Sequence, residues 1–173
     1  MRIGLAGAAA FVAMLAAPAL AQTRADDALR CVGPDPDDKI VGCSALIAAG
    51  DKNPSDLAIV YYNRAGGHDA KKDSAAALAD YTKAVELDPG DAETHVMRGW
   101  LYQRLGRRDD AIADYSRALA LSPGGDQLYI VDAYFRRSEL YAQKRLYRQA
   151  LDDINRTIAL KPSFDALAHN ARA

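Results

Sequence analysis

The sequence predicts an all-α protein: a right-handed solenoid of about three helix–turn–helix units, with an N-terminal cap helix and a short C-terminal helix. The main observation is a phrase that recurs along the chain. Residues 81–90 (YTKAVELDPG) return as residues 115–124 (YSRALALSPG), and again, after a slightly longer interval, as residues 154–163 (INRTIALKPS). A period of about 34 residues is typical of stacked helix–turn–helix repeats. Small and apolar residues also recur three and four positions apart, which places them along one stripe of a helix.

The first 21 residues have the pattern of a secretory signal peptide. Arg2 supplies a positive charge, residues 3–17 are uncharged and apolar, and Pro18 is followed by small residues that end at Ala21. This pattern predicts export and cleavage after Ala21. The alternative is an uncleaved membrane anchor, but the apolar run is short beside the roughly 20 residues that a span requires. We therefore expect no stable membrane span after cleavage.

The mature chain has the length of one domain and a weak net charge. Removal of residues 1–21 leaves 152 of the 173 residues, and it lowers the basic residues from 22 to 21 against 23 acidic ones, a net charge of −2. One domain is expected at this length. Because no dense basic patch is present, the sequence argues against nucleic-acid binding.

Residues 22–57 are expected to form an N-terminal cap segment. Asp35 suits the residue before a helix, Pro36 suits the first helical position, and Gly50 suits the end of the helix. The terminal units of a solenoid are usually atypical caps of this kind. A helix beginning at Pro36 should therefore close the N-terminal end of the stack.

The two cysteines, Cys31 and Cys43, both lie in this cap segment. An even number of cysteines in an exported chain predicts one disulfide. Closing a loop of this size contributes about 3 kcal/mol in the chain-entropy model. We expect Cys31 to pin a preceding strand across the cap helix. A redox role or a zinc site is disfavoured, because the spacing is not C-x-x-C and no histidine is nearby.

The middle unit, residues 92–125, indicates how each unit packs. The small residue Gly99 should let the two helices approach, Tyr115 should fill the space between them, and Gly106 should end the first helix. The facing stripes are His95, Gly99 and Tyr102 in the first helix, and Ala111, Tyr115 and Ala118 in the second, which Asp109 and Asp110 open and Pro123 ends.

This pattern resembles the tetratricopeptide repeat, whose period is about 34 residues. The resemblance covers residues 58–164, with units at 58–91, 92–125 and 131–164 and an insertion at 126–130. The matching residues are Tyr61, Ala65, Ala77, Tyr81, Ala84 and Pro89 in the first unit, and Tyr134, Ser138, Tyr141, Ala150, Ile154, Thr157 and Pro162 in the third. The middle unit has His95 where the family usually has tryptophan.

Two segments depart from the family pattern. Residues 124–130 lengthen one junction, and we expect Tyr129 and Ile130 to pack on the next helix rather than reach a partner. Residues 66–67 are a glycine pair inside a first helix; because each glycine costs about 1 kcal/mol against alanine, that helix should be short or kinked. A site of close backbone approach is the alternative there. Residues 165–173 should form a C-terminal capping helix.

No catalytic constellation is found in the sequence. His68, His95 and His169 are scattered, and none lies in an H-E-x-x-H motif or beside a candidate nucleophile. The paired acids at 37–38, 109–110 and 152–153 are interpreted as helix-capping and surface charges. The sequence therefore predicts a protein that is not an enzyme and that needs no cofactor and no metal.

The resemblance also implies a binding surface, because the first helix of each tetratricopeptide unit lines a concave groove. The positions carried over are Tyr62 and Asn63 in the first unit, Val96, Met97, Trp100 and Arg104 in the second, and Phe135, Arg136 and Glu139 in the third. Ile59, Glu93, Gln103, Asp132 and Gln143 complete the set. Tryptophan, tyrosine and arginine dominate binding hot spots. The alternative is that the aromatic residues pack against the neighbouring first helix.

One subfamily holds the C-terminal carboxylate of chaperones with lysine and asparagine at fixed groove positions. Here Tyr62, Gly66, Met97 and Asp132 replace four of those five residues, and only Arg136 fits. The sequence therefore disfavours that mode of binding.

The hypothesis that follows is a non-catalytic adaptor or scaffold that binds a protein or peptide segment in the groove. The chain is similar to short exported tetratricopeptide proteins of Gram-negative bacteria, which implies the periplasm. One alternative is a self-associating structural component of an envelope assembly. A further alternative is an enzyme accessory or a weak hydrolase. It is less favoured, because the sequence contains no catalytic motif.

Overall fold

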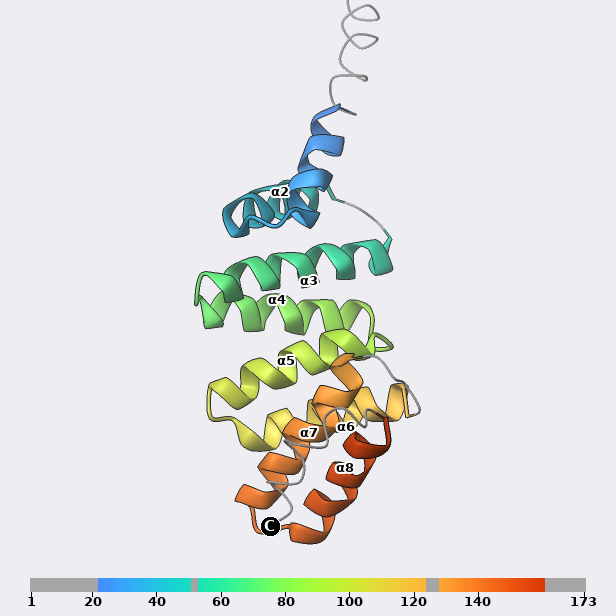
Figure 1. Cartoon of the computed structure of the whole chain (residues 1–173). Coiled ribbons are helices and arrows are strands. Elements are labelled where there is room, and N and C mark those ends of the chain that lie inside the picture. The colour runs from blue at the N-terminus through green and yellow to red at the C-terminus, as the bar shows by residue number, and fades with distance from the viewer. Residues whose placement is uncertain (1–21, 51–52, 124–127, 161–173) are drawn as a thin grey trace, which may run out of the picture. The chain divides into compact units, whose positions relative to one another are not determined.

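Every secondary-structure element among the described residues is a helix. The computed structural model describes residues 22–50, 53–123 and 128–160. A helix covers residues 22–32, and it is followed by α2 (Pro36–Ala48), α3 (Pro54–Ala70), α4 (Ser74–Leu87), α5 (Ala92–Arg104), α6 (Arg108–Leu121), α7 (Leu128–Gln143) and α8 (Tyr147–Leu160) (Figure 1). The predicted all-α class is confirmed.

The chain divides into two compact units, Met1–Asp80 and Tyr81–Ala173. In the first unit α2 packs on α3, and in the second α5 packs on α6, α6 on α7 and α7 on α8. The predicted signal peptide, residues 124–127 of the insertion and the predicted C-terminal helix at 165–173 lie outside the described residues.

The cap helix α2 begins and ends where its sequence indicates. The side chain of Asp35 accepts hydrogen bonds from the backbone N–H groups of Asp37 at 2.9 Å and Asp38 at 3.0 Å. These bonds satisfy two donors that the first turn of a helix leaves without a partner. Pro36 occupies the first position, and Gly50 follows the helix with a φ of 72°, a conformation that glycine adopts without strain.

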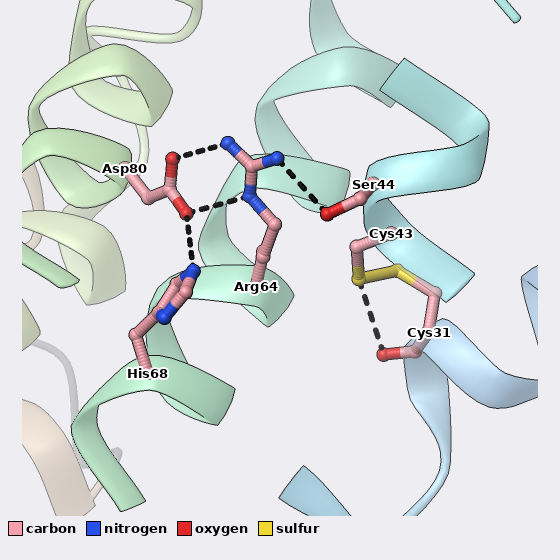
Figure 2. The surroundings of a disulfide bond; sticks show 6 residues. All are labelled: Cys31, Cys43, Ser44, Arg64, His68 and Asp80. Carbon is pink, nitrogen blue, oxygen red and sulfur yellow. Dashed lines mark hydrogen bonds and ion pairs between the residues drawn. A yellow bond between two sulfur atoms is a disulfide. The ribbon is translucent and has the colours of Figure 1, made fainter. Parts of the chain in front are cut away.

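The predicted disulfide joins Cys31 to Cys43 and ties the helix at 22–32 to α2 (Figure 2). Both cysteines are buried, and their Cα atoms are 4.7 Å apart. The expected strand before α2 is wrong: residues 22–32 are helical. Glutamine, alanine, leucine and arginine, all good helix formers, make up much of this segment.

Gly42 lies where this first helix crosses α2. A Cβ atom at Gly42 would lie 2.4 Å from the carbonyl oxygen of Asp27 and 2.8 Å from the backbone nitrogen of Cys31. Only a residue without a side chain therefore permits the two helices to approach this closely beside the disulfide.

The glycine pair at 66–67 does not shorten the first helix of its unit, contrary to expectation. Helix α3 runs without a break from Pro54 to Ala70. A Cβ atom at Gly67 would lie 3.1 Å from both the carbonyl oxygen of Pro36 and Cγ1 of Ile40. The close approach of α2 explains this glycine, and the burial gained by that packing offsets its low helix propensity.

The second unit has the packing that its repeat predicts. Tyr115 is fully buried, and a Cβ atom at Gly99 would lie 3.0 Å from the tyrosine ring. Gly106 ends α5 with a φ of 75°, and the N–H groups of Gly106 and Arg107 donate to the carbonyls of Gln103 and Tyr102. This pair of bonds is the Schellman arrangement that ends many helices at glycine.

The inter-repeat insertion contributes its last residues to a helix. Helix α7 begins at Leu128 rather than at residue 131. Ile130 is fully buried in the core of the second unit, and Tyr129 packs against that core. Both residues were expected to pack on the next helix; they are instead part of that helix, and they pack against the core.

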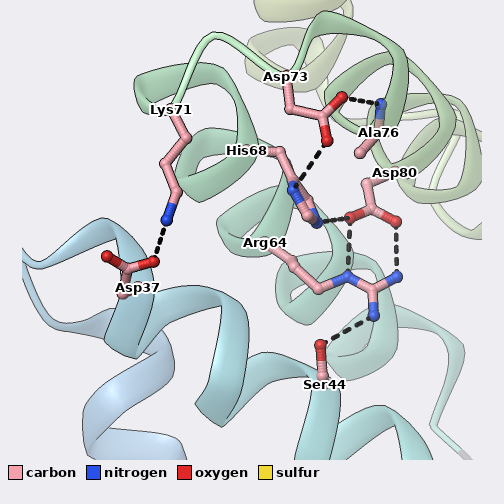
Figure 3. Close-up of polar contacts among 8 residues, drawn as sticks. All are labelled: Asp37, Ser44, Arg64, His68, Lys71, Asp73, Ala76 and Asp80. Carbon is pink, nitrogen blue, oxygen red and sulfur yellow. Dashed lines mark hydrogen bonds and ion pairs between the residues drawn. The ribbon is translucent and has the colours of Figure 1, made fainter.

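A buried arginine–aspartate pair, which was not predicted from the sequence, joins α3 to α4, α5 to α6 and α7 to α8. In the first repeat, Arg64 donates two hydrogen bonds of 2.7 Å to Asp80 (Figures 2 and 3). The equivalent pairs are Arg98 with Asp114 and Arg137 with Asp153, with bonds of 2.7 to 2.8 Å. The three arginines are separated by the same intervals as the three copies of the recurring phrase, so the sequence did contain a signal for them.

Two of these arginines also reach the helix before their own repeat. Nη1 of Arg64 donates to Oγ of Ser44 on α2 at 3.2 Å, and Nη1 of Arg137 donates to Oγ of Ser116 on α6 at 2.8 Å. A single guanidinium thus joins three helices through its fork of donors. The interpretation of residue 153 as a surface charge is wrong, because Asp153 is 4% exposed and lies in the middle of α8.

Around the Arg64 pair, further polar contacts join the turn after α3 to its neighbours. Nε2 of His68 lies 3.8 Å from Oδ2 of Asp80, and Nδ1 lies 4.0 Å from Oδ2 of Asp73. Nζ of Lys71 forms an ion pair with Asp37 at the start of α2 (Figure 3). This exposed pair contributes little to stability by itself.

Two turns place a residue other than glycine in the left-handed conformation that Gly106 adopts. Lys72 has a φ of 63° and Arg145 a φ of 61°. We expect Arg145→Gly to raise the free energy of unfolding of the second unit by roughly 0.5–1 kcal/mol, because relief of left-handed strain exceeds the entropy cost of glycine. Urea denaturation measures the change. Arg145→Ala is the control, since it keeps the strained Cβ; an equal gain from alanine would contradict the explanation.

Candidate functional site

The predicted groove residues are distributed over both units. Tyr62 and Asn63 lie on α3 of the first unit, and both are partly buried. Seven others lie in the second unit, on α5 and α7: Val96, Met97, Trp100, Arg104, Phe135, Arg136 and Glu139. Glu93, Gln103, Asp132 and Gln143 lie on the same two helices. The candidate site is therefore the part of the predicted groove that α5 and α7 form.

Not all of these positions present a surface. Val96 is 0% exposed and belongs to the core of the second unit, so its inclusion as a surface residue of the groove is corrected. Its position on α5 turns it toward the neighbouring helices, where apolar burial favours valine. Met97 is partly buried and packs against the same core, and Phe135 is also partly buried.

Trp100 is the centre of a shallow pocket between α5 and α7. The pocket has a volume of about 310 Å³ and is lined by Trp100, Gln103, Arg104 and Arg136. The guanidinium carbon of Arg104 lies 4.7 Å from the centroid of the indole ring, and that of Arg136 lies 5.8 Å from it. Both distances permit an attractive cation–π interaction, which is strongest with tryptophan. The four lining residues all belong to the groove positions predicted from the sequence, and the structure thus brings them together.

A residue of the hydrophobic core, Tyr115, holds the side chain of Gln103 in place. The hydroxyl of Tyr115 donates to Oε1 of Gln103 at 3.0 Å. Burial raises the pKa of the Tyr115 hydroxyl, so this group remains a donor at neutral pH. The side-chain amide of Gln103 in turn hydrogen-bonds the carboxyl of Glu139 on α7. The buried tyrosine therefore fixes a polar group at the pocket surface.

Charges on α7 surround this network. Nε of Arg136 donates to Oδ2 of Asp132 at 2.5 Å, a pair one helical turn apart. Burial raises the pKa of the Glu139 carboxyl; Asp132 acts in the same direction, while Arg136 and the hydrogen bond from Gln103 oppose it. Glu139 is therefore easier to protonate than an exposed glutamate.

Comparisons with known proteins identify the architecture. Family models described as tetratricopeptide repeat match residues 58–91 and 92–124. These ranges agree with the first unit and, to within one residue, with the second unit that the sequence indicates. The chain therefore contains tetratricopeptide repeats. No protein with a curated description matches it.

Solved structures show the same fold at low sequence identity. A tetratricopeptide repeat protein from Parabacteroides merdae aligns with a TM-score of 0.74 and 20% identity, covering 87% of this chain and 57% of that one. YrrB, described as a TPR protein with an unusual peptide-binding site, aligns at 0.63 and 22%, covering 79% and 66%. The first TPR of Spaghetti (RPAP3), bound to the HSP90 peptide SRMEEVD, aligns at 0.60 and 25%, covering 68% and 89%.

Two further findings concern other kinds of site. Within residues 22–50, 53–123 and 128–160, no group of three or more histidine, cysteine, aspartate or glutamate side chains is placed to hold a metal ion. None of the helices in the same ranges combines the length and apolar character needed to cross a bilayer.

Proposed function

We propose that this protein is a non-catalytic adaptor that binds a segment of a partner protein on the surface of its first helices, centred on Trp100. The observation that carries the proposal is the pocket between α5 and α7, in which an indole ring lies beside two guanidinium groups. Tryptophan and arginine are the residue types most enriched in binding hot spots.

The family and its relatives support a protein partner. Tetratricopeptide repeats serve as protein–protein interaction modules, and two of the similar structures are described with a peptide or a peptide-binding site. The first helices of the repeats are well suited to such a role, because buried arginine–aspartate pairs hold each of them to the second helix of its repeat. A surface supported in this way loses little conformational freedom when a partner binds.

The test compares capture by the mature chain with capture by a Trp100→Ala, Phe135→Ala double variant of confirmed helicity. We expect the mature chain to retain a partner from envelope extract and the double variant to lose it, since truncation of a hot-spot aromatic costs about 2 kcal/mol or more of binding free energy. Leu151→Ala, which truncates an exposed apolar residue on α8, is the matched control and should retain the partner. Equal capture by the double variant would remove these aromatics from the site.

We also propose that the adaptor works in the cell envelope. The signal-peptide pattern of residues 1–21 supports export, and the disulfide between Cys31 and Cys43 supports an oxidising compartment such as the periplasm. Sequencing the N-terminus of the protein from fractionated cells tests this part: a start at Gln22 in the periplasmic fraction is expected. Retention of Met1 in the cytoplasm would contradict it.

A second candidate is self-association into an envelope assembly. The observation that favours it is a set of exposed apolar residues in the first unit, namely Leu29 and Val32 in the helix at 22–32 and Val41 on α2. Large exposed apolar residues in one region are common at interfaces. If neither form captures a partner and the mass of the mature chain rises with concentration, self-association becomes the better explanation.

A further inference from the structure

The turn between α5 and α6 and the turn between α7 and α8 lie side by side in the second unit. Nε of Arg108 donates to Oε1 of Gln143 at 3.0 Å, and Lys144 forms an ion pair with Asp109. A shallow depression of about 350 Å³ is lined by residues of both turns. The two turns therefore present one continuous surface. We call it the basic edge and define it as residues 105–110 and 144–148.

The basic edge carries more positive charge than its own acidic residues neutralise. It contains five basic residues and two acidic ones, a net charge of +3, in a chain whose net charge is −1. Arg107 pairs with Asp110, and Lys144 pairs with Asp109. Within the described part of the chain, no acidic side chain pairs with the remaining three, which are all exposed: Arg108, Arg145 and Arg148.

The other end of α5 has the opposite charge. Residues 88–93, which lead from α4 into α5, contain three acidic residues and no basic one. The 13 residues of α5 separate these acids from the basic edge by about 20 Å. An anionic surface therefore attracts the basic edge and repels the start of α5, which gives the second unit a preferred orientation in front of that surface.

Exposed apolar side chains lie among the charges of the basic edge. Leu105 is 44% exposed, Leu146 is 40% exposed and Tyr147 is 61% exposed. Leu105 belongs to the first turn, and the other two lie between two arginines of the second. This mixture suits the boundary of a lipid bilayer, where arginines meet the phosphates, a tyrosine ring lies at headgroup level and leucines enter the outer acyl region.

Arg145 occupies a position at which glycine would be less strained. Its φ is 61°, and the equivalent residue of the preceding repeat is Gly106, with a φ of 75°. In both turns the N–H of this residue donates to the carbonyl three residues earlier. The arginine thus weakens the turn that it occupies. Strain of this kind collects where a side chain serves a function, and the side chain of Arg145 is exposed on the basic edge.

We propose that the basic edge docks this protein on the surface of a bilayer that contains anionic phospholipids. The arginines bind the lipid phosphates, and Leu105, Leu146 and Tyr147 enter the boundary with the acyl chains. An acidic protein would attract the same charges, but a hydrated acidic surface offers no apolar environment to these three side chains. The proposal goes beyond the adaptor function and does not depend on it, because the Trp100 pocket is lined by other residues.

Co-sedimentation with lipid vesicles tests the proposal. The probe is a vesicle of phosphatidylglycerol and phosphatidylcholine in equal parts, and a vesicle of phosphatidylcholine alone is the neutral control. The mature protein, beginning at Gln22, is used because the apolar residues 3–17 would enter any bilayer by themselves. We expect the mature protein to sediment with the anionic vesicles only, and more weakly as salt is added, since salt screens exposed charges.

Arg145→Gly is the most informative charge variant. We expect it to bind anionic vesicles about fivefold more weakly, because one positive charge near an anionic surface is lost. The same substitution relieves the left-handed strain, so weaker binding cannot be a result of unfolding. Adding Arg148→Gln should make the total loss about 25-fold. Arg117→Gln, an exposed arginine of α6 outside the basic edge, is the matched control and should leave binding unchanged.

A second pair of variants tests the apolar contact. Tyr147 is 61% exposed on the basic edge, and Leu128 is 64% exposed at the opposite end of the hairpin formed by α7 and α8. We expect Tyr147→Ser to weaken vesicle binding several-fold, because an interfacial aromatic side chain is lost, and Leu128→Ser to leave it unchanged.

Equal binding to anionic and neutral vesicles, or equal losses for Arg145→Gly and Arg117→Gln, would overturn the proposal. If Tyr147→Ser binds vesicles as well as the wild type does, and soluble polyglutamate binds the protein as tightly as the vesicles do, the basic edge belongs to an acidic protein and membrane docking is rejected. None of these results decides the adaptor function, which is tested in solution by capture through Trp100 and Phe135.

Discussion

Replacing Asp114 by alanine is expected to lower the free energy of unfolding of the second unit by about 3–5 kcal/mol, the cost of leaving a buried charge without its partner. Asp114 is 5% exposed and accepts two hydrogen bonds from Arg98, at 2.7 and 2.8 Å. Nδ1 of His95 lies 3.1 Å from the same carboxylate, and Nε2 lies 3.3 Å from the carbonyl of Pro89. Loss of Asp114 therefore leaves two polar side chains of α5 without their acceptor.

The matched control is Asp110→Ala, four residues earlier on α6. Asp110 pairs with Arg107 at 2.7 Å, yet both side chains are about half exposed. Because exposed ion pairs contribute little, this variant should lose less than about 1 kcal/mol in the same urea titration. Similar losses for both variants would show that burial of Asp114 is not what makes its pair important.

A double variant can show why Asp114→Ala loses stability: because the attraction between Arg98 and Asp114 is lost, or because the charge of Arg98 is left buried without a partner. An Arg98→Met, Asp114→Leu double variant replaces both charges by apolar side chains, and it should recover most of the loss caused by Asp114→Ala. If the double variant is as unstable as the single one, the pair itself stabilises the repeat, and the cost of an unpaired arginine does not explain the effect.

The difference between the wild type and Asp114→Ala should also depend on pH. Burial tends to raise the pKa of Asp114, but hydrogen bonds from Arg98 and His95 outweigh it and hold that pKa below its ordinary value of 3.8. A depressed carboxyl pKa contributes stability that is present above the unfolded pKa and lost as the pH falls through the folded one. The difference should therefore be constant from neutral pH to about 5 and shrink below about 4.

The features that the sequence predicted well depend on local periodicity. Gly99 and Tyr115 lie on facing stripes of adjacent helices, and a single turn with a glycine at its end joins them, so the helical period alone brings them together. The caps at Asp35 and Gly106 follow from backbone groups within four residues of each. Contacts of this range need no knowledge of the rest of the fold.

The errors arise where a third element decides the environment. Val96 has the spacing of a groove residue, but its burial depends on helices beyond its own hairpin. Gly67 lowers the helix propensity of α3, and the sequence alone does not show that the close approach of α2 requires a residue without a side chain there. The sequence placed Gln103 in the groove, but only its bond to Tyr115 shows how its side-chain amide is oriented, because an isolated amide has no preferred direction.

Gly42→Ala is the prediction with the largest expected effect in the first unit. The new methyl group would lie 2.4 Å from the carbonyl oxygen of Asp27 and 2.8 Å from the nitrogen of Cys31, both backbone atoms that no rotation of a side chain can move. The helix at 22–32 would have to shift as a body. Overpacking of this kind costs about 3 kcal/mol, and we expect that loss in hydrogen-exchange protection of α2.

The neighbouring disulfide makes this substitution informative in a second way. Cys43 follows Gly42 directly and is bonded to Cys31 in the helix that the methyl group displaces, so the two helices can separate only by rotation about that bond. Separation would expose two cysteines that are 2% exposed or less in the wild type, and dithiothreitol should reduce the bond several-fold faster in Gly42→Ala.

Gly90→Ala is the matched control, because its Cβ would meet only the side-chain oxygen of Asp88, at 3.3 Å, which can rotate away. It should change neither α2 protection nor the rate of disulfide reduction. Equal reduction rates for Gly42→Ala and the wild type would mean that the helix at 22–32 accommodates the methyl group without leaving α2. Faster reduction would show that glycine and cystine act together: the first permits the close crossing, and the second keeps it in place.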